Sequence, residues 1–276
     1  MTSVPVFESA LTRMPRLGLG TWPMKGAECR AAVESALGLG YRHIDMAEMY
    51  GNEEEVGAAI NASGVPRGEI YLTTKVWWDK PRGDAIRRAF EDSLRRLAQP
   101  YVDLLLIHWP SPELDLPDAL RALARLREEG LARAVGVANF PLGLLRRAVE
   151  AEIAPIACLQ VEHHVFLSQR RLLDYTQPRG IVLTSYTPVA KGEVAKDPVI
   201  QRIAAKHGAT PGQVALAWLL SMPGVAAIPK SALPARQREN LEAVDLALDA
   251  EDLAALAALP KDRRLVNPGF APDWNA

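Results

Sequence analysis

The chain has 276 residues, of which 49% are hydrophobic, and its 32 basic and 33 acidic residues leave a formal charge of -1 at pH 7. This length and composition allow one domain with a large core over residues 1–276. Because the charges balance, composition argues against nucleic acid and anionic membranes as partners and favours small ligands that are bound in a pocket.

The two cysteines, Cys29 and Cys158, lie far apart and have no CxxC spacing. This pattern argues against a disulfide framework or a zinc site and suits a reducing compartment. The first residues, MTSVPVFESALTRMPR, lack the basic start and apolar stretch of a secretion signal, and no later run is long enough to span a membrane. We therefore expect a cytoplasmic protein.

Short apolar runs rich in branched residues alternate with longer amphipathic stretches along the chain. In chain order, the predicted strands are RLGLG, YRHIDM, IYLTTKV, YVDLLLIH, RAVGVANF, ACLQVE, IVLTSY and VAAIP. Between them, residues 84–97 and 117–129 repeat apolar residues at helical spacing. Alternation of strand and helix predicts a parallel sheet, and about eight repeats predict closure into a (β/α)8 TIM barrel.

Three more helices are expected toward the end of the chain, and two of them are additions to the regular pattern. Residues 198–207 and 211–222 both read as helices between the last two strands, so one is an addition to the repeat. Another extra helix, residues 249–259, precedes a C-terminal tail that we expect to lie over the active-site face. The rival fold, an open dinucleotide-binding sheet, should carry GxGxxG after an early strand, and that motif is missing.

Ionisable side chains stand at the ends of three successive predicted strands. The second strand ends at Asp45 and leads to Tyr50, the third ends at Lys75, and the fourth ends at His108. In a parallel barrel these strand ends share the functional face. Asp45 should keep Lys75 charged, and Lys75 should lower the pKa of Tyr50 below its usual value of about 10, which suits a general acid. Taken singly, a histidine at a strand end or an Asp and Lys pair more often has a structural role.

Three long motifs in the sequence indicate a resemblance to a known protein family. GYRHIDMAEMYGNEEEVG, LARAVGVANF and IPKSALPARQRENL occur in this order, and the chain resembles the aldo-keto reductase superfamily from GLGTW nearly to its end. LIHWPSP and RLVNPGFAPDW make it most similar to the bacterial branch of 2,5-diketogluconate reductases. The resemblance implies an NADPH-dependent oxidoreductase that reduces aldehydes or ketones, including keto sugars, and that acts as a monomer.

The resemblance also assigns roles to residues. Tyr50 would donate the proton, Lys75 and Asp45 would tune it, and His108 would orient the carbonyl. The implied NADPH/NADP+ contacts are Thr21, Trp22, Asn139, Gln160, Tyr186, Thr187, Pro188, Val189, Lys191, Lys230, Ser231, Arg236, Glu239 and Asn240. The substrate walls would include Trp22, Trp77, His108 and Trp109, with Trp78 and Trp274 as further candidates. No metal is implied.

The sequence departs from the family pattern at several positions. Ala138 replaces a serine that helps to hold the nicotinamide carboxamide, and Met46 replaces a small residue after Asp45, so both bear on cofactor binding. His163 and His164 interrupt a usual Tyr-His-Pro, and we interpret both as structural because neighbouring strand residues point to opposite faces.

Two other functions compete with this interpretation. A metal-dependent barrel hydrolase would use His43 and Asp45 as ligands, but of the five histidines only His108 is also well placed. A non-catalytic relative would keep the nucleotide as a sensor or a partner subunit, and the intact set of four residues argues against it.

Overall fold

A computed structural model describes residues 4–275. Eight parallel strands form one sheet in the order β10-β9-β8-β7-β6-β5-β4-β3, so every strand lies beside its neighbour in the chain. The strands are β3 (Leu19–Gly20), β4 (His43–Asp45), β5 (Tyr71–Val76), β6 (Val102–Ile107), β7 (Ala132–Ala138), β8 (Ile156–Glu162), β9 (Val182–Tyr186) and β10 (Val225–Ala227).

Backbone contacts between the first and last strands close the sheet into a barrel. Leu17 bridges Ala227 and Gly20 bridges Lys230, both in the parallel sense. A side chain at Gly20 would not fit, because its Cβ would lie 2.7 Å from the carbonyl oxygen of Ile228. The glycine in the first predicted strand therefore permits closure of the ring, and the predicted (β/α)8 fold is confirmed.

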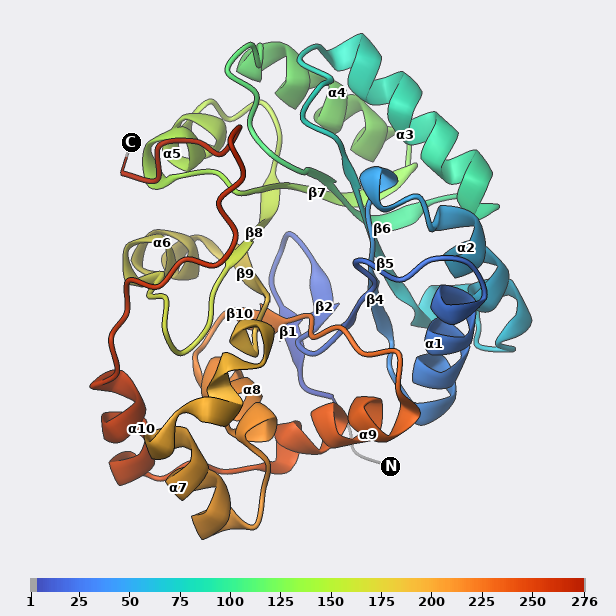
Figure 1. Ribbon diagram of the computed structural model, residues 1–276. Helices are drawn as coiled ribbons and strands as arrows, with labels where there is room; N and C mark the ends of the chain where they lie inside the picture. Colours follow the sequence, from blue (N-terminus) through green and yellow to red (C-terminus); the bar gives the residue numbers. More distant parts are fainter. Residues whose placement is uncertain (1–3, 276) are drawn as a thin grey trace.

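Helices surround the strands as an outer ring (Figure 1). The helices of the repeat are α1 (Gly26–Leu39), α2 (Glu53–Ala62), α3 (Gly83–Leu97), α4 (Leu116–Glu128), α5 (Leu142–Glu150), α6 (Arg170–Thr176), α8 (Pro211–Ser221) and α9 (Pro234–Glu242). The additions are α7 (Pro198–His207) and α10 (Ala250–Ala257), and the short 3-10 helices are η1 (Glu48–Tyr50), η2 (Arg67–Glu69), η3 (Gln177–Arg179), η4 (Ala190–Lys196) and η5 (Ala243–Asp245). The extra helices thus lie where the sequence predicts them.

Alternation along the strands divides the core into two parts. On β5, Tyr71 belongs to the cluster inside the barrel, whereas Leu72 and Val76 belong to the cluster between strands and helices. On β6, Leu104 and Leu106 lie inside. Because strand side chains alternate between faces, Lys75 and His108 continue the inner rows of these two strands.

A hairpin covers the amino-terminal end of the barrel. Strands β1 (Val6–Glu8) and β2 (Arg13–Pro15) pair in the antiparallel sense and are visible through the middle of the ring (Figure 1). Met14 is buried in the inner cluster, and the hydroxyl groups of Thr12 and Tyr71 lie 2.7 Å apart. The opposite, carboxyl end of the strands is therefore the end that stays open.

Local signals explain the helices of the outer layer. Helix α8 begins with Pro211 after Thr210, whose side chain and Gln213 form a capping box, and Asp249 with Asp252 does the same for α10. These helices pack with α7 as a second apolar cluster beside the barrel. None of the helices within residues 4–275 has the length and apolar run that a bilayer crossing requires.

Candidate active site

The inner rows of four strands end in polar side chains at the open end of the barrel. Lys75 Nζ donates to Asp45 Oδ1 at 2.5 Å and to the carbonyl oxygen of Met46 at 2.8 Å. Gln160 Nε2 donates to the other carboxylate oxygen of Asp45 at 2.7 Å. All three side chains are buried, and the pairing of both Asp45 oxygens offsets part of the cost of burying this carboxylate.

Tyr50 and His108 lie beside this ion pair. The 3-10 turn η1 carries Tyr50 over the strand ends, with its ring centre 5.6 Å from that of His108 and 5.1 Å from Lys75 Nζ. His108 Nδ1 is buried and has no hydrogen-bond partner among residues 4–275. The structure thus brings together the four predicted catalytic side chains and leaves one ring nitrogen of His108 without a partner.

The pKa of Tyr50 shifts in the opposite direction from the sequence prediction. Burial raises the pKa of this phenol well above 10, and the negative charge of Asp45 raises it further. Lys75 does not offset this effect, because its ammonium group is committed to Asp45 and to Met46. The expectation that Lys75 lowers the pKa of Tyr50 is therefore wrong for this geometry.

His108 is a neutral imidazole in this site. Burial lowers its pKa well below 6.5, and the nearby charge of Lys75 acts in the same direction. Burial lowers the pKa of Lys75 as well, while the carboxylate of Asp45 opposes that shift. At neutral pH, Tyr50 therefore carries a proton and His108 can donate a hydrogen bond without being charged.

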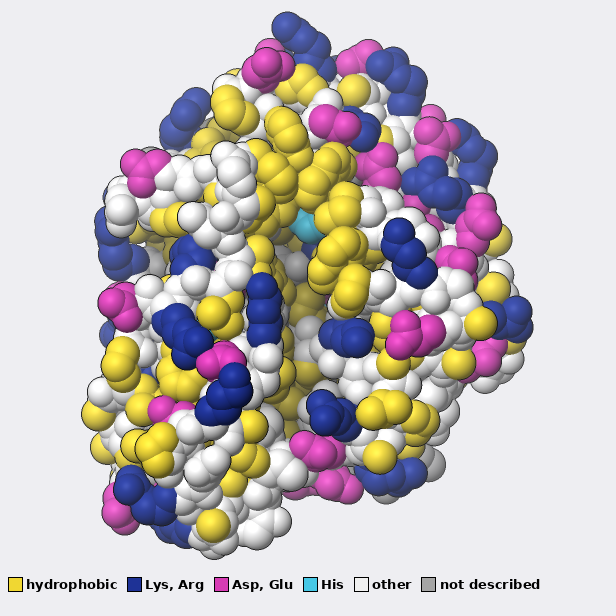
Figure 2. All heavy atoms as spheres, viewed as in Figure 1, with side chains coloured by type: hydrophobic (Ala, Val, Ile, Leu, Met, Phe, Trp, Pro, Cys, Tyr) yellow, Lys and Arg dark blue, Asp and Glu magenta, His cyan; other side chains and the backbone are white. Residues whose placement is uncertain are grey.

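A deep groove lined by hydrophobic side chains crosses this face, and a histidine side chain is visible in it (Figure 2). The ring centre of Trp77 lies 5.0 Å from His108, and that of Trp22 lies 5.1 Å from Tyr50. Trp109 faces Phe270 at 5.5 Å and Trp274 at 5.9 Å. The predicted tryptophans therefore surround the candidate site.

The residues assigned to the nicotinamide are also grouped at the open end. Tyr186 donates its hydroxyl hydrogen to Asn139 Oδ1 at 2.8 Å, and Asn139 Nδ2 donates to the carbonyl oxygen of His108 at 2.9 Å. Thr21 donates to the carbonyl oxygen of Asp45 at 3.0 Å. Asn139 has a φ of 62°, a left-handed conformation that asparagine tolerates better than most residues. These bonds fix the side chains relative to the four catalytic candidates.

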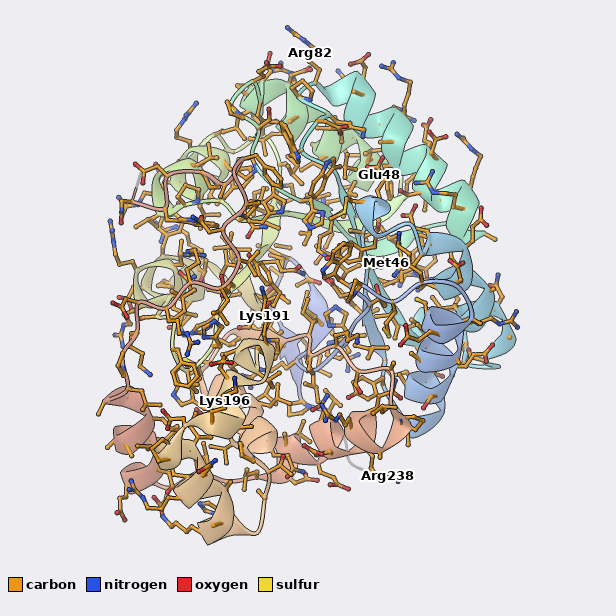
Figure 3. The ribbon with its side chains drawn as sticks, viewed as in Figure 1. Met46, Glu48, Arg82, Lys191, Lys196 and Arg238 are labelled. Atoms are coloured by element: carbon orange, nitrogen blue, oxygen red, sulfur yellow. The ribbon has the colours of Figure 1, made fainter. Side chains whose placement is uncertain are left out.

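The segment after β9 has an irregular backbone. Thr187, Ala190 and Lys191 have φ values of 53°, 48° and 53°, and Pro188 and Val189 lie between them. Lys191 Nζ donates to the carbonyl oxygen of Leu265 at 3.0 Å, so the lysine binds the C-terminal tail. In Figure 3, Lys191 and the pair Met46 and Glu48 come from different sides of the open face.

The residues assigned to the adenosine half lie around the start of α9. Lys230 and Arg236 are exposed, and no hydrogen bond or ion pair holds either side chain within the described part of the chain. Ser231 Oγ accepts from the amide of Leu233 at 3.2 Å, and Glu239 accepts from Thr210 at 2.6 Å. Asn240 is partly buried. Two unpaired cations near a helix amino terminus favour an anion there.

The departures from the family pattern are all buried. Met46 belongs to the main core, where only its carbonyl oxygen meets Lys75, and Ala138 belongs to the inner cluster. His163 contacts Ser185 and His164 contacts Glu162, at 3.2 and 3.0 Å. The two histidines thus bind different partners, in agreement with the structural interpretation.

The side chains of the rival metal site are bound within the protein. His43 contacts the carbonyl oxygen of Pro15 and the hydroxyl of Thr73, both at 3.2 Å, while Asp45 binds Lys75 and Gln160. Within residues 4–275, no three His, Cys, Asp or Glu side chains are grouped as ligands of one metal ion.

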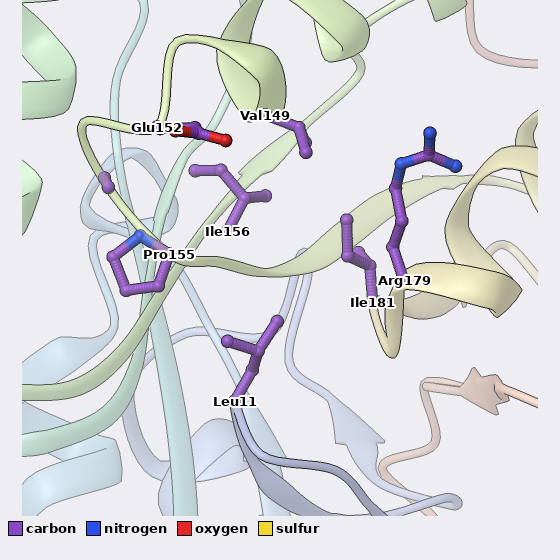
Figure 4. Close-up of a pocket in the computed structure, with 8 residues that line it drawn as sticks. Leu11, Val149, Glu152, Pro155, Ile156, Arg179 and Ile181 are labelled. Carbon is purple, nitrogen blue, oxygen red and sulfur yellow. The ribbon is translucent and has the colours of Figure 1, made fainter.

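Another hollow lies away from these residues. It has a volume of about 320 Å³ and is lined by Leu11 of the hairpin loop and by residues at the starts of β8 and β9, among them Ile156 and Ile181 (Figure 4). It belongs to the amino-terminal end of the barrel and contains none of the residues that the sequence predicts for the site.

Sequence reasoning missed two contributors to the site. Phe270 contacts Trp77, Trp78 and Trp109, with ring centres 5.1 to 5.5 Å apart. Glu48 Oε2 accepts from the backbone amide of Trp77 at 3.1 Å, which ties the loop of Tyr50 to that tryptophan. The aromatic position within a tail rich in Pro and Gly was the available signal for Phe270.

Comparisons with known proteins agree with the motifs. The model of the Aldo/keto reductase family matches residues 16–261. Methylglyoxal reductase DkgB of Escherichia coli O157:H7 is 45% identical over 266 residues, which cover 95% of this chain and 99% of that protein. An aldo-keto reductase of Mycolicibacterium smegmatis is 42% identical, over 91% of this chain and 92% of its own length.

Solved structures show the same similarity. The crystal structure of a candidate 2,5-diketo-D-gluconic acid reductase B has a TM-score of 0.92 and 44% identity, and the match covers 95% of this chain and 94% of that one. An aldo-keto reductase from a deep-sea metagenome library has a TM-score of 0.89 at 37% identity, over 94% of this chain and 96% of that one. The resemblance inferred from the sequence is confirmed.

Proposed function

The chain belongs to the aldo-keto reductase family, and from this membership we propose that it reduces aldehydes or ketones with NADPH, with Tyr50 as the proton donor. It is thus an oxidoreductase. The observation that supports this chemistry best is the imidazole of His108, with an unpaired ring nitrogen, beside the protonated phenol of Tyr50. A carbonyl oxygen that meets both groups would accept hydrogen bonds from both.

The proposed roles follow from the contacts at the strand ends. When NADPH is bound, its reduced nicotinamide supplies a hydride to the carbonyl carbon. Tyr50 gives its proton to the oxygen as negative charge develops there, and neutral His108 holds that oxygen with a hydrogen bond. The alkoxide is a stronger base than a phenolate, so Tyr50 can act as an acid even with its raised pKa. Asp45 and Lys75 keep the surrounding polar groups fixed.

The fit of the cofactor rests on two groups of residues. Gln160 uses its amide nitrogen on Asp45, which leaves its amide oxygen for the nicotinamide carboxamide, and Tyr186 offers a ring for stacking. Lys230 and Arg236 are free to bind a ribose 2'-phosphate, which NADH lacks. We therefore propose NADPH rather than NADH as the cofactor, held by the residues named above from Thr21 to Asn240.

The substrate class follows from the groove and from the relatives. The relative called methylglyoxal reductase suggests small dicarbonyl compounds, and the hydrophobic groove suits larger apolar carbonyls. All four catalytic candidates come from one chain, which supports a monomer as the working unit. Both cysteines are free and buried, which supports our proposal that the enzyme works in the reducing cytoplasm.

Replacement of Tyr50 tests the function directly. Tyr50→Phe removes the hydroxyl group and keeps the ring, so kcat/KM for carbonyl reduction should fall by at least about a hundredfold while NADPH binding persists. Tyr175→Phe, at a buried tyrosine outside the groove, is the matched control and should leave kcat/KM unchanged. Activity of Tyr50→Phe within a few-fold of wild type would contradict the assignment.

The wild-type assay distinguishes an enzyme from a non-catalytic relative. We expect NADPH oxidation that depends on an added aldehyde, diketone or keto sugar. Tight binding of NADPH without turnover over this whole panel would favour a sensor or a partner subunit instead.

A further inference from the structure

The C-terminal tail, residues 260–275, runs along one side of the open face, from α10 past α6 toward α5, as the red trace in Figure 1. Its first part pairs with the loop after β8 through backbone hydrogen bonds, from Ser168 to Lys261 at 3.0 Å and from Arg263 to Phe166 at 2.9 Å. Its later part carries Phe270 and Trp274, which face the tryptophans of the groove. The contacts that hold the stretch between Arg263 and Phe270 therefore determine where the aromatic rings lie.

Glu162, at the end of β8, holds that stretch. Its carboxylate accepts from the backbone amide of Leu265 at 2.7 Å and from that of Val266 at 3.0 Å. After Arg263, within the described residues, these are the backbone amides that bind the tail to the barrel. Glu162 is therefore the last main-chain anchor before Phe270.

The environment of Glu162 suits an anchor. The side chain is completely buried, two residues beyond Gln160 on the same inner row of β8. His164 Nε2 lies 3.0 Å from one oxygen, and Arg264 of the tail lies 3.7 Å from the other. A buried carboxylate requires such partners, and two of the four come from tail amides, so a release of the tail would leave it unsatisfied.

We propose that Glu162 is a positioning residue for substrate selection, an inference that rests on the proposed function. It fixes the tail so that Phe270 completes the aromatic wall with Trp77 and Trp109. Substrates whose carbonyl carries a flat apolar group, such as aryl aldehydes, gain from this wall because their ring can pack against Phe270. Three-carbon dicarbonyls need only Tyr50 and His108 and do not depend on the anchor.

Glu162→Gln tests the anchor, with 4-nitrobenzaldehyde and methylglyoxal as probes and NADPH as reductant. The amide presents its nitrogen to one of the two backbone donors, so one tail bond is lost. We expect kcat/KM for the aryl aldehyde to fall about tenfold through a higher KM, with methylglyoxal within about twofold. A purely structural role would reduce the active fraction equally for both substrates, so their ratio would stay constant.

Two further variants keep the test decisive. Glu162→Asp retains the charge but shortens the side chain, and its ratio of kcat/KM values should fall between those of wild type and Glu162→Gln. A truncation that lacks residues 269–276 removes Phe270 and Trp274, and Glu162→Gln added to it should change the ratio no further. The proposal that Glu162 anchors the tail would be overturned if the ratio of the two kcat/KM values were unchanged in both point variants. It would also be overturned if the effects of Glu162→Gln and the truncation were additive. Wild type inactive toward both probes would instead contradict the proposed function.

Discussion

Two buried histidines inside the same barrel differ in how their rings are used. At the covered end, His43 has a partner for each ring nitrogen, in Pro15 and Thr73. At the open end, His108 Nδ1 has no partner within residues 4–275. Burial lowers the pKa of both imidazoles. The two ends therefore differ in whether their buried polar groups have hydrogen-bond partners. At the covered end the protein supplies these partners itself, and at the open end it leaves polar groups that a ligand can bind.

Charged side chains at the two ends of the barrel differ in the same way: some are paired within the protein and others are not. At the start of β6, Asp103 accepts from Arg67 at 2.8 Å and from the amide of Leu72 at 3.0 Å, and Arg133 lies 3.4 Å away. Around the start of α9, the cations Lys230 and Arg236 have no ion pair among the described residues. Changes at the covered end should therefore affect stability, and changes at the open end should affect binding and turnover.

The largest effect is expected at the covered end. Asp103→Ala leaves the partly buried Arg67 without its carboxylate, so the free energy of unfolding should fall by about 3 kcal/mol, measured by urea denaturation. The kcat/KM of the folded protein should stay within twofold. Glu34→Gln, in an exposed pair with Arg30, is the control and should change stability little. A loss of turnover as large as that of Tyr50→Phe would show that the two ends are not separable.

The next effect concerns the unpaired cations. Arg236→Ala should weaken NADPH binding about tenfold to a hundredfold and NADH binding much less, because one charge-assisted hydrogen bond to the 2'-phosphate is lost. Arg238→Ala is the control, since Arg238, labelled in Figure 3, lies two positions further along α9 and therefore, by the helical repeat, on another side of the helix. Fluorescence titration gives the Kd values, and added salt should reduce the preference for NADPH. Equal losses for both cofactors would assign Arg236 to the adenine or to the fold.

The burial of His43 should make the free energy of unfolding depend on pH. His43 has a pKa of about 4 in the folded protein against 6.5 when exposed, so its contribution to stability is complete above pH 6.5. It is lost as pH falls toward 4, at about 1.4 kcal/mol per pH unit. In His43→Gln, the fall in unfolding free energy between pH 6.5 and 5 should be shallower by this amount. Parallel curves for wild type and variant would contradict burial as the cause.

The smallest expected effect is that of pH on the rate of carbonyl reduction, which should hardly change near neutrality. With the pKa of Tyr50 above 10 and that of His108 well below 6.5, both groups keep their protonation state between pH 6 and 9. Single-turnover reduction should therefore be nearly constant over this range. A decrease in rate as pH rises from 7 to 9 would mean that the pKa of Tyr50 is lowered in the complex with the cofactor.

Much of the fold could be predicted because local patterns determine it. The strand ends at Asp45, Lys75 and His108 follow from alternation along single strands, and Gly20 lies in its predicted strand. The direction of the pKa shift of Tyr50 could not be predicted, since it depends first on how deeply the folded chain buries the phenol and then on the nearby charge of Asp45. Glu162 was not predicted as an anchor for a related reason: its partners Leu265 and Val266 lie about a hundred residues away in sequence.

The seam where the ring closes has a consequence for motion. Three backbone hydrogen bonds join its sides, from Gly18 to Ala227, from Ala227 to Arg16 and from Gly20 to Pro229. Arg16 adds side-chain bonds to the carbonyl oxygens of Leu220, Met222 and Val225. So short a seam should open locally before longer strand pairs do, and the amides of Gly18, Gly20 and Ala227 should exchange with deuterium ahead of those inside β6. Thr21 and Lys230 continue the two sides of the seam. A nucleotide that contacts both Thr21 and Lys230 would therefore hold the two sides of the seam together. Its binding should slow hydrogen exchange at the amides of Gly18, Gly20 and Ala227.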